Sequence, residues 1–308
     1  MITCLGLSPA LDVTYGVGAL VVGGIHRPDW KISLPGGKAL NVARALRALG
    51  EPVRAIAPLG GPIGAQIRAA LDADGLEVVA VEAEAPTRTC VSVVDAGDGR
   101  ITEFYEHAVP LDDVAWAGVT DAVAAVDAGW LAVSGSVPDD RADELAEILA
   151  RAAARGIRLA LDQRGRALRA ALAAVRPEVV KVNRGEAEEA VGTGSAAELA
   201  ARLRERGART AIVTDGAAGS VAVGVGGAWQ TAPFSAGAFT VGAGDSFLAG
   251  LLSALRAELP LEAALRRAAA VAAANTRRPG AALFDPADAE ASAGDIMVTK
   301  LLEAGHAS

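Results

Sequence analysis

The feature that most constrains the fold of this chain is the alternation of short apolar runs with alanine-rich amphipathic stretches. The apolar runs predict buried strands at residues 2–7, 53–58, 128–134, 157–162, 178–183 and 210–214. The amphipathic stretches, whose apolar residues recur with a helical period, predict helices at 38–49, 63–74, 139–154, 196–206, 244–257 and 261–276. Strands that alternate with helices form a parallel sheet covered by helices. We therefore expect an α/β protein with a mostly parallel central sheet.

Two segments interrupt this alternation. Around residues 12–34 and 87–107 the pattern is strand-like, with glycine punctuation and little helical period. In the second segment, residues 88–94 and 101–105 flank the turn-rich sequence Ala96-Gly-Asp-Gly99, which predicts a β-hairpin. We expect these segments to form a small separate sheet inserted into the main domain.

Composition excludes several classes of protein. Of the 308 residues, 52% are hydrophobic, which is enough for a large core. A net charge of −8 argues against a protein that coats nucleic acid or an anionic membrane. Two cysteines, Cys4 and Cys90, are too few for a disulfide scaffold or a cysteine-rich metal site. With no export signal or membrane-spanning stretch in the sequence, we expect a cytoplasmic protein that binds neither nucleic acid nor membranes.

The densest chemical signal is the segment Thr240-Val-Gly-Ala-Gly-Asp-Ser-Phe247, which stands directly before a strongly periodic helix. A glycine-rich helix entry leaves several backbone N–H groups without intrahelical partners, at the end where the helix dipole is positive. Such an entry suits an anion whose negative charge grows during a reaction. The carboxylate of Asp245 can there take a proton from a hydroxyl that attacks phosphorus. The alternative is a tight turn followed by an ordinary helix-start aspartate.

A second glycine pair, Gly36 and Gly37, precedes the helix expected at 38–49. Lys38 and Asn41 lie near the first turn of that helix. There Lys38 can neutralise a phosphate and Asn41 can bridge hydroxyl groups. The alternative is a loop followed by a solvated lysine.

Two arginines, Arg27 and Arg88, are the other candidate cations, one in each strand-like segment. A guanidinium suits phosphate recognition because it binds through two parallel hydrogen bonds. The alternative for each is a solvated surface residue.

The segment Lys181-Val-Asn-Arg-Gly-Glu186 follows the end of a predicted strand. Asn183 and Glu186 could hold a hydrated Mg²⁺, which keeps several waters and takes few protein ligands. An acidic first turn of an ordinary helix is the alternative.

Other chemistries lack their signatures in this sequence. It contains no GxxxxGK[ST] phosphate-binding loop and no GxSxG nucleophile elbow. Its three histidines form no HExxH motif. The run Gly192-Thr-Gly-Ser-Ala-Ala197 follows an acidic helical stretch rather than a strand, so we interpret it as a loop and not as a dinucleotide-binding fingerprint.

Taken together, these segments resemble the pfkB-type sugar kinases of the ribokinase-like superfamily, in the 1-phosphofructokinase and tagatose-6-phosphate kinase branch. Two signatures carry the resemblance, Gly36-Gly37-Lys-Ala-Leu-Asn41 and Gly242-Ala-Gly-Asp245. Supporting similarities occur in order along the chain at Ser8–Asp12, Ser134–Pro138, Leu161–Asp162, Lys181–Glu186 and Thr214–Gly219. The chain departs from the pattern at Phe239, Val182, Asp215 and Gln163-Arg164.

The resemblance implies a three-layer α/β/α fold with a mostly parallel central sheet and a small β-sheet lid. It implies a main nucleotide- and substrate-binding domain at residues 1–9, 35–86 and 109–308. The lid would comprise residues 10–34 and 87–108, cover the sugar, and pair with another subunit's lid in a homodimer.

The resemblance also implies roles for individual residues. Asp245 would be the catalytic base, beside an anion hole formed by Gly242, Ala243 and Gly244. The sugar phosphate would contact Asp12, Arg27, Gly36, Gly37, Lys38, Asn41, Arg88 and Ser136, with the three cations around its phosphate. The nucleotide site would include Lys181, Asn183, Thr214, Gly216, Gly219 and Asn275. Mg²⁺ would be held through water by Glu186 and Asn183.

The function implied is an ATP-dependent kinase that transfers the γ-phosphoryl group to a hydroxyl of a ketohexose phosphate. Fructose 1-phosphate or fructose 6-phosphate would give fructose 1,6-bisphosphate. The alternatives are a tagatose-6-phosphate kinase, a ribokinase-like kinase of a neutral sugar or nucleoside, and a non-catalytic sugar- or nucleotide-binding module. The three candidate cations argue against a neutral substrate.

Overall fold

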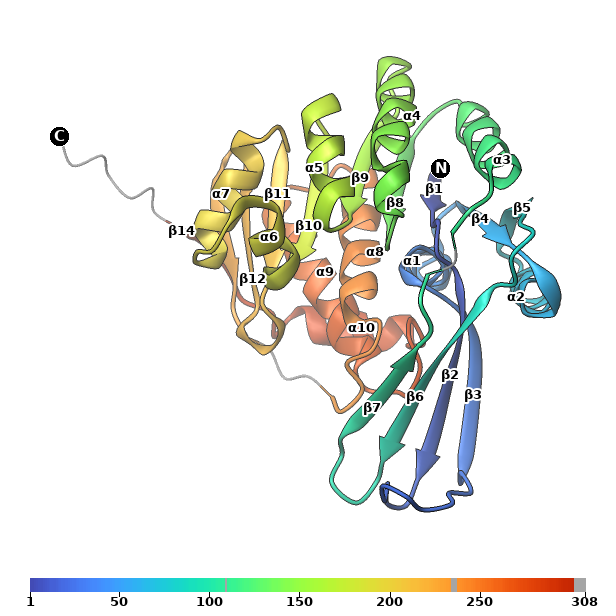
Figure 1. Ribbon diagram of the computed structural model, residues 1–308. Helices are drawn as coiled ribbons and strands as arrows, with labels where there is room; N and C mark the ends of the chain where they lie inside the picture. The colour runs from blue at the N-terminus through green and yellow to red at the C-terminus, as the bar shows by residue number, and fades with distance from the viewer. Residues whose placement is uncertain (109, 234–236, 302–308) are drawn as a thin grey trace.

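The computed structural model describes residues 1–108, 110–233 and 237–301, and its centre is a ten-stranded sheet (Figure 1). Strands β11, β10, β9, β8, β1, β4 and β5 are parallel neighbours, and β12, β13 and β14 extend the β11 edge antiparallel. In sheet order the strands are β14 (Val298–Leu301), β13 (Gly227–Thr231), β12 (Ser220–Gly224), β11 (Thr210–Thr214), β10 (Val179–Asn183), β9 (Arg158–Asp162), β8 (Trp130–Ser134), β1 (Ile2–Leu5), β4 (Val53–Leu59) and β5 (Glu77–Glu82). The expected mostly parallel central sheet is therefore confirmed.

Helices cover both faces of this sheet and make three layers, as Figure 1 shows. One face packs against α1 (Lys38–Ala48), α2 (Gly61–Ala73), α8 (Ala243–Arg256), α9 (Leu261–Asn275) and α10 (Pro286–Ala293). The other packs against α3 (Asp113–Ala124), α4 (Ala142–Ala154), α5 (Gly165–Ala174), α6 (Arg184–Val191) and α7 (Ala196–Glu205). Because both faces are covered, the parallel strands are apolar on both sides.

Strand alternation assigns each side chain to one of the two cores. In β8, Trp130 and Ala132 belong to the core under α1 and α8, whereas Leu131 and Val133 belong to the core under α4 and α5. The neighbouring β9 follows the same rule, with Ala160 on the first side and Leu161 on the second. This alternation decides which side chains at the strand ends point toward α8.

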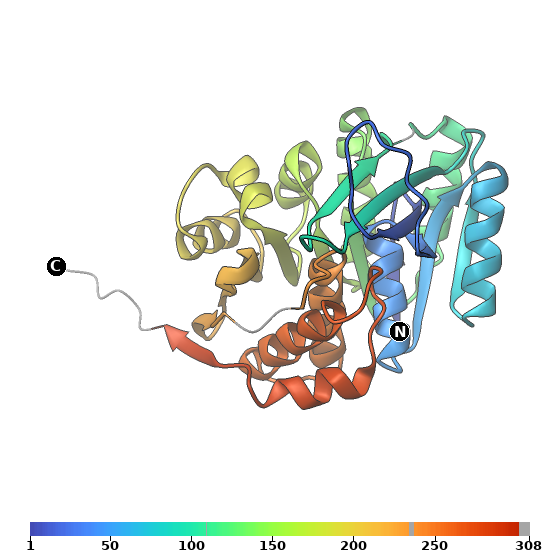
Figure 2. The ribbon, with the colours of Figure 1, turned by 90° about the horizontal axis from the view of Figure 1, so that it is seen from below.

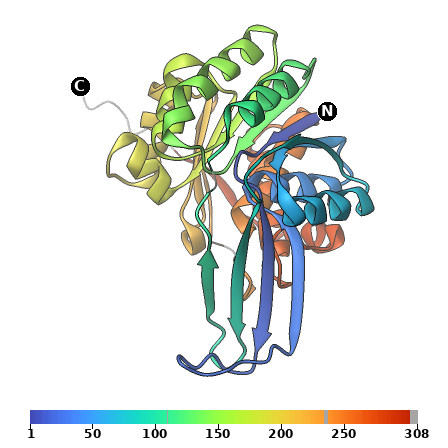
Figure 3. The ribbon, with the colours of Figure 1, turned by 45° about the vertical axis from the view of Figure 1, so that its right-hand side comes forward.

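A second, four-stranded sheet, called the lid sheet below, stands away from the main body (Figure 3). Its order is β3 (Trp30–Gly36), β2 (Ala10–Val17), β6 (Arg88–Asp95) and β7 (Ile101–Tyr105). The antiparallel pair β6–β7 is the hairpin expected from the sequence, and β2 pairs parallel with β6. Figure 2, the view from below, shows the loop between β2 and β3 at the end of this sheet nearest the viewer. The division of the chain into a main domain and a lid domain stays a prediction.

The six expected strands and six expected helices are all present, with ends that differ by a few residues. The helix expected at 139–154 begins with a 3₁₀ turn, Asp139–Arg141, before α4. The sequence reading did not resolve β5, α3, α5, α10 or the antiparallel edge strands β12–β14. In the described part of the chain, no helix is both long and apolar enough to cross a membrane.

Candidate active site

The site is built where the parallel strands end. Ser134, Asp162, Lys181 and Thr214 stand at or near the carboxyl ends of the adjacent strands β8, β9, β10 and β11. Each lies two residues after a core residue on the α1/α8 side of the sheet, so their side chains point to that side. Ser134 and Asp162 are paired in register. This edge of an open α/β sheet is where ligands bind as a rule.

A cavity of about 740 Å³ lies over this edge. The sequence-predicted residues that line it are Asp12, Gly37, Lys38, Asn41, Arg88, Ser136, Lys181, Asn183, Thr214, Gly216, Gly242, Ala243, Gly244 and Asp245. They come from the lid sheet, the start of α1, the strand ends and the start of α8. The fold thus brings the early glycine pair and the late glycine-rich segment into one cavity.

The start of α8 forms a cradle of backbone amides. Its N-cap, Gly242, has a φ of 77°, and a Cβ there would lie 2.6 Å from the Ala281 side chain, so glycine is required. The helix ladder starts with the Ser246 N–H, which donates to the Gly242 carbonyl, so the earlier amides of Gly244 and Asp245 precede the first helical hydrogen bond. These amides and the positive end of the helix dipole suit a phosphate group.

Asp245 lies in the first turn of α8, is only 6% exposed, and lines the cavity. Burial, together with the nearby charge of Asp162, raises its pKa to about 7, although Lys38, Lys181 and a hydrogen bond from Asn41 act in the opposite direction. That hydrogen bond joins Asn41 Nδ2 to Asp245 Oδ2 at 2.9 Å. A carboxylate with a pKa near neutrality is well matched to general-base work.

Asp162 is fully buried between two lysines. Its Oδ1 accepts from Lys38 Nζ at 2.9 Å, and its Oδ2 accepts from Lys181 Nζ at 2.7 Å. Burial alone would raise the pKa of Asp162, but Lys181 and Lys38 hold it below the usual range. Lys181 also lies against the amide cradle, since a Cβ on Gly244 would be 3.1 Å from its Nζ.

Glu186 and Asn183 form a capping box that begins α6. Glu186 N–H donates to Asn183 Oδ1, and Asn183 N–H donates to Glu186 Oε2, both at 2.9 Å. The remaining carboxylate oxygen, Oε1, pairs with Lys38 Nζ at 2.6 Å. Each carboxylate oxygen of Glu186 thus has one protein partner and keeps a second lone pair, which suits contact with a hydrated Mg²⁺ through water. Among the described residues, no group of three or more His, Cys, Asp or Glu is placed to hold a metal directly.

The far end of the cavity is lined by the lid sheet and contains Asp12 and Arg88. Gly36 leaves room for Asp12, because a Cβ there would overlap its carboxyl group. Burial raises the pKa of Asp12 to about 6, against a hydrogen bond from the Gly37 amide and the charge of Arg44. Arg88 donates to the carbonyls of Glu106 at 2.6 Å and Ser8 at 3.4 Å, and its buried Nε has no partner among the described residues.

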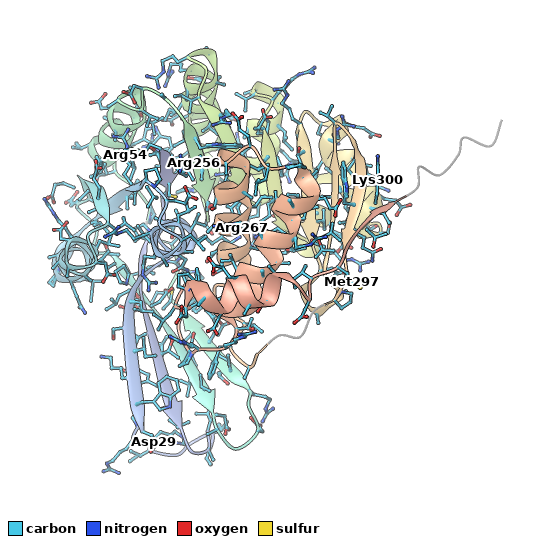
Figure 4. The ribbon with its side chains drawn as sticks, turned by 180° about the vertical axis from the view of Figure 1, so that it is seen from behind. Asp29, Arg54, Arg256, Arg267, Met297 and Lys300 are labelled. Carbon is cyan, nitrogen blue, oxygen red and sulfur yellow. The ribbon has the colours of Figure 1, made fainter. Side chains whose placement is uncertain are left out.

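Five of the sequence-predicted residues do not line the cavity. Gly36 lies under Asp12, and Glu186 meets the site through its ion pair with Lys38. Gly219, with a φ of 93°, closes a turn against the Thr231 carbonyl. Arg27 is exposed in the loop between β2 and β3, two residues from Asp29, which Figure 4 shows at the distal end of the lid sheet.

Asn275, predicted to line the nucleotide site, is instead fully buried behind the start of α8. Its Oδ1 accepts from Ser246 Oγ at 3.1 Å and from the Ala282 N–H at 2.7 Å, and its Nδ2 donates to the Val241 carbonyl at 2.9 Å. These bonds hold the segment that precedes the amide cradle.

Among the groups at the site that sequence reasoning missed are Asp162, Glu103 and Tyr105. Asp162 was noted as a strand end, but its ion pairs depend on α1 and β10 and leave no local signal. Glu103 and Tyr105 of β7 line the lid end and hydrogen-bond to each other. The alternation of β7 alone could have shown that these two side chains share a face.

Comparison with known proteins decides the family. The domain described as pfkB family carbohydrate kinase matches residues 32–288. The chain belongs to the pfkB family. The chain is 34% identical over 279 residues to 1-phosphofructokinase of Rhodobacter capsulatus, covering 87% of this chain and 88% of that one. It is 30% identical over 299 residues to ATP-dependent 6-phosphofructokinase isozyme 2 of Escherichia coli K12, covering 93% and 96%.

Solved structures share the pfkB fold. Phosphofructokinase-2 from Escherichia coli in complex with substrates and products matches with a TM-score of 0.88 and 28% identity, covering 96% of this chain and 98% of that one. A possible 1-phosphofructokinase from Thermotoga maritima matches with a TM-score of 0.83 and 21% identity, covering 98% and 100%. The α/β layers with a smaller separate sheet are thus the fold of pfkB kinases, as the sequence resemblance predicted.

Proposed function

We propose that this pfkB kinase transfers the γ-phosphoryl group of ATP to a hydroxyl of a ketohexose phosphate, fructose 1-phosphate or fructose 6-phosphate, and so makes fructose 1,6-bisphosphate. The observation that carries the proposal is the position of Asp245. It is a buried carboxylate with a raised pKa, at an amide cradle, in a cavity that contains cations at both ends. The two phosphofructokinase relatives support the substrate class.

In this proposal Asp245 takes the proton of the acceptor hydroxyl as its oxygen attacks the γ-phosphorus. The amides that begin α8 and the Lys181 ammonium face the phosphoryl group as its charge redistributes. Phosphoryl transfer depends on alignment and charge stabilisation more than on covalent chemistry by the protein. Asn41 fixes the orientation of the base through its hydrogen bond.

The nucleotide would lie along the ends of β10 and β11, where Asn183, Thr214 and Gly216 line the cavity. Mg²⁺ would neutralise charge on the ATP phosphates. Asn183 and Glu186 are the residues that would hold it, through water. Gly219 and Asn275 would support the nucleotide site from behind rather than touch ATP.

At the other end, Arg88 is the cation that we propose for the phosphate already on the sugar. Of the cavity's cationic side chains in the described chain, Lys38 and Lys181 are in ion pairs with carboxylates, whereas Arg88 contacts only carbonyl groups. In this proposal Asp12 would accept hydrogen bonds from sugar hydroxyls. Lys38 stands between the two ends, so its predicted contact with the sugar phosphate stays a prediction.

A panel of acceptors tests the proposal. With MgATP, we expect turnover of fructose 1-phosphate or fructose 6-phosphate at far lower concentration than of fructose, ribose or adenosine. Tagatose 6-phosphate is the comparison within the same class, and the product's phosphate positions identify the hydroxyl that reacts. If a neutral sugar or nucleoside is the preferred substrate, the proposed specificity for a sugar phosphate is wrong. If acceptors bind but none is phosphorylated, the protein is a sugar- or nucleotide-binding module and not a kinase.

We further propose a homodimer formed through the lid sheet. Large apolar side chains outside the cavity are exposed on this sheet and its β2–β3 loop, at Val21, Val22, Ile25, Trp30 and Phe104. Exposed apolar clusters of this kind mark protein contacts. We expect light scattering to give a dimer mass and Val22→Asp with Ile25→Asp to reduce it to the monomer. The cytoplasmic location stays a prediction.

A further inference from the structure

The carboxylate of Asp162 is the only group of the site that contacts both lysines of the cavity within the described chain. Lys38 comes from the first turn of α1 and Lys181 from β10, and their ammonium groups reach Asp162 at 2.9 Å and 2.7 Å. The lysine side chains are 34% and 4% exposed, and Asp162 is 0% exposed. Asp162 therefore acts only through its neighbours.

Two ammonium groups held close together in a poorly solvated site repel each other. A carboxylate with one oxygen for each lysine removes that repulsion and fixes both positions at once. The positions matter because Lys181 Nζ lies against Gly244 in the amide cradle, and Lys38 spans from Asp162 to Glu186. Lys181 therefore borders the place proposed for the transferred phosphoryl group, and Lys38 lines the same cavity.

We propose that Asp162 is a positioning residue for phosphoryl transfer, holding the Lys38 and Lys181 ammonium groups beside the amide cradle of α8. The proposal rests on the proposed function, which places the γ-phosphoryl group at that cradle. It assigns Asp162 a role through the lysines rather than contact with the reacting atoms. A shift of these ammonium groups by about 1 Å would cost up to roughly 10²-fold in rate.

Asp162 also contributes to the electrostatic setting of Asp245. The groups that act on Asp245 are Asp162 from β9, Lys181 from β10, and Lys38 and Asn41 from α1. The negative charge of Asp162 raises the pKa of Asp245, and the two lysines lower it. Neutralising Asp162 while keeping both lysines therefore lowers the pKa of Asp245. A neutral substitution away from this network would not move this ionisation.

The test combines Asp162→Asn, Lys38→Met and the charge-balanced double variant Lys38→Met/Asp162→Asn. We expect Asp162→Asn to lower kcat by about 10- to 100-fold and to change the KM of the sugar phosphate little. The acid limb of the pH profile, where kcat/KM falls as Asp245 is protonated, should move to lower pH. Because both changes act on one network, the double variant should lose less activity than the product of the single losses. Asp143→Asn, at an exposed ion pair with Arg166, is the matched control and should match the parent.

Three results would overturn the proposal. One is a folded Asp162→Asn enzyme with kcat within about twofold of the parent and an unmoved acid limb. Another is full multiplication of the two single losses in the double variant. If Asp162→Asn alone fails to fold, a Lys38→Met enzyme with kcat within about twofold of the parent overturns the proposal instead. The third is a raised half-saturating Mg²⁺ concentration in Asp162→Asn alone, which would make Asp162 a metal carboxylate. Asp245→Asn, assayed in parallel, tests the proposed base separately.

Discussion

The two ends of the cavity are built differently. At the transfer end, Asp245, Asp162 and Lys181 come from the main sheet and its helices and are buried, and Asp162 forms an ion pair with Lys181. At the sugar end, Asp12 and Arg88 come from the lid sheet, and Arg88 is held only by backbone carbonyls. The residues proposed for phosphoryl transfer thus lie on the main sheet and its helices. The lid sheet instead carries Arg88, which has no carboxylate partner in the described chain and could bind a substrate phosphate. The difference predicts that rate and substrate choice separate under mutation.

The largest effect is expected at the transfer end. Asp245→Asn removes the proposed proton acceptor with little change of shape, so kcat should fall by at least about 10²-fold. Binding of MgATP, measured by calorimetry, should survive because the amide cradle is unchanged. Near-normal turnover of the folded variant would remove Asp245 from the role of base.

Mutation at the sugar end should instead raise the KM of the sugar phosphate. Arg88→Gln removes the charged donor proposed for the sugar phosphate. Loss of such a hydrogen bond, about 1.5–3 kcal/mol, should raise KM by roughly 10- to 100-fold. The KM of ATP should hardly change. Arg100→Gln on the same hairpin, 83% exposed, is the matched control. An equal loss of affinity for unphosphorylated fructose would show that Arg88 does not bind the phosphate.

The pH dependence distinguishes the two carboxylates. Asp245 must be deprotonated to act, and its pKa is raised to about 7, so kcat/KM should fall as pH drops through 7, by about tenfold from the plateau to pH 6. Asp12, with its pKa raised to about 6, should steepen the fall at lower pH. A profile that stays flat from pH 8 to 5.5 would contradict the assignment of the base.

The smallest effect on activity is expected for Asn275, which is buried behind the amide cradle of α8. Asn275→Ala leaves the Ala282 N–H and the Val241 carbonyl without their partner and should cost about 1–3 kcal/mol in the free energy of unfolding. Denaturant titration measures this loss. Because Asn275 lies outside the cavity, kcat should fall more than the KM of ATP rises. A selective rise in the KM of ATP would instead support direct contact with the nucleotide.

Much of the fold could be predicted because its signals are local. Parallel strands covered on both faces are continuous apolar runs. Helix α1 starts directly after the pair Gly36-Gly37 and α8 directly after Gly242, so their limits were predicted within a residue or so. The edge strands β12–β14 were missed because an antiparallel, half-exposed edge has a weaker pattern. Most of the fourteen predicted residues that line the cavity lie in short motifs at strand ends and helix starts, whereas Arg88 was singled out only by its charge.

The sequence by itself determined the alternation of elements, the amide cradle and the carboxylate beside it, because glycine, helix periodicity and a helix-start aspartate act within a few residues. Only the tertiary structure decided which charges meet. Lys38 and Asp162 are 124 residues apart and pair because β9 lies between β8 and β10, under the start of α1. The same packing pairs Lys38 with two carboxylates and leaves Arg88 without a carboxylate partner in the described chain. It also places Arg27 at the distal end of the lid sheet. Ion pairs depend on distances across the fold, and no local pattern encodes those distances.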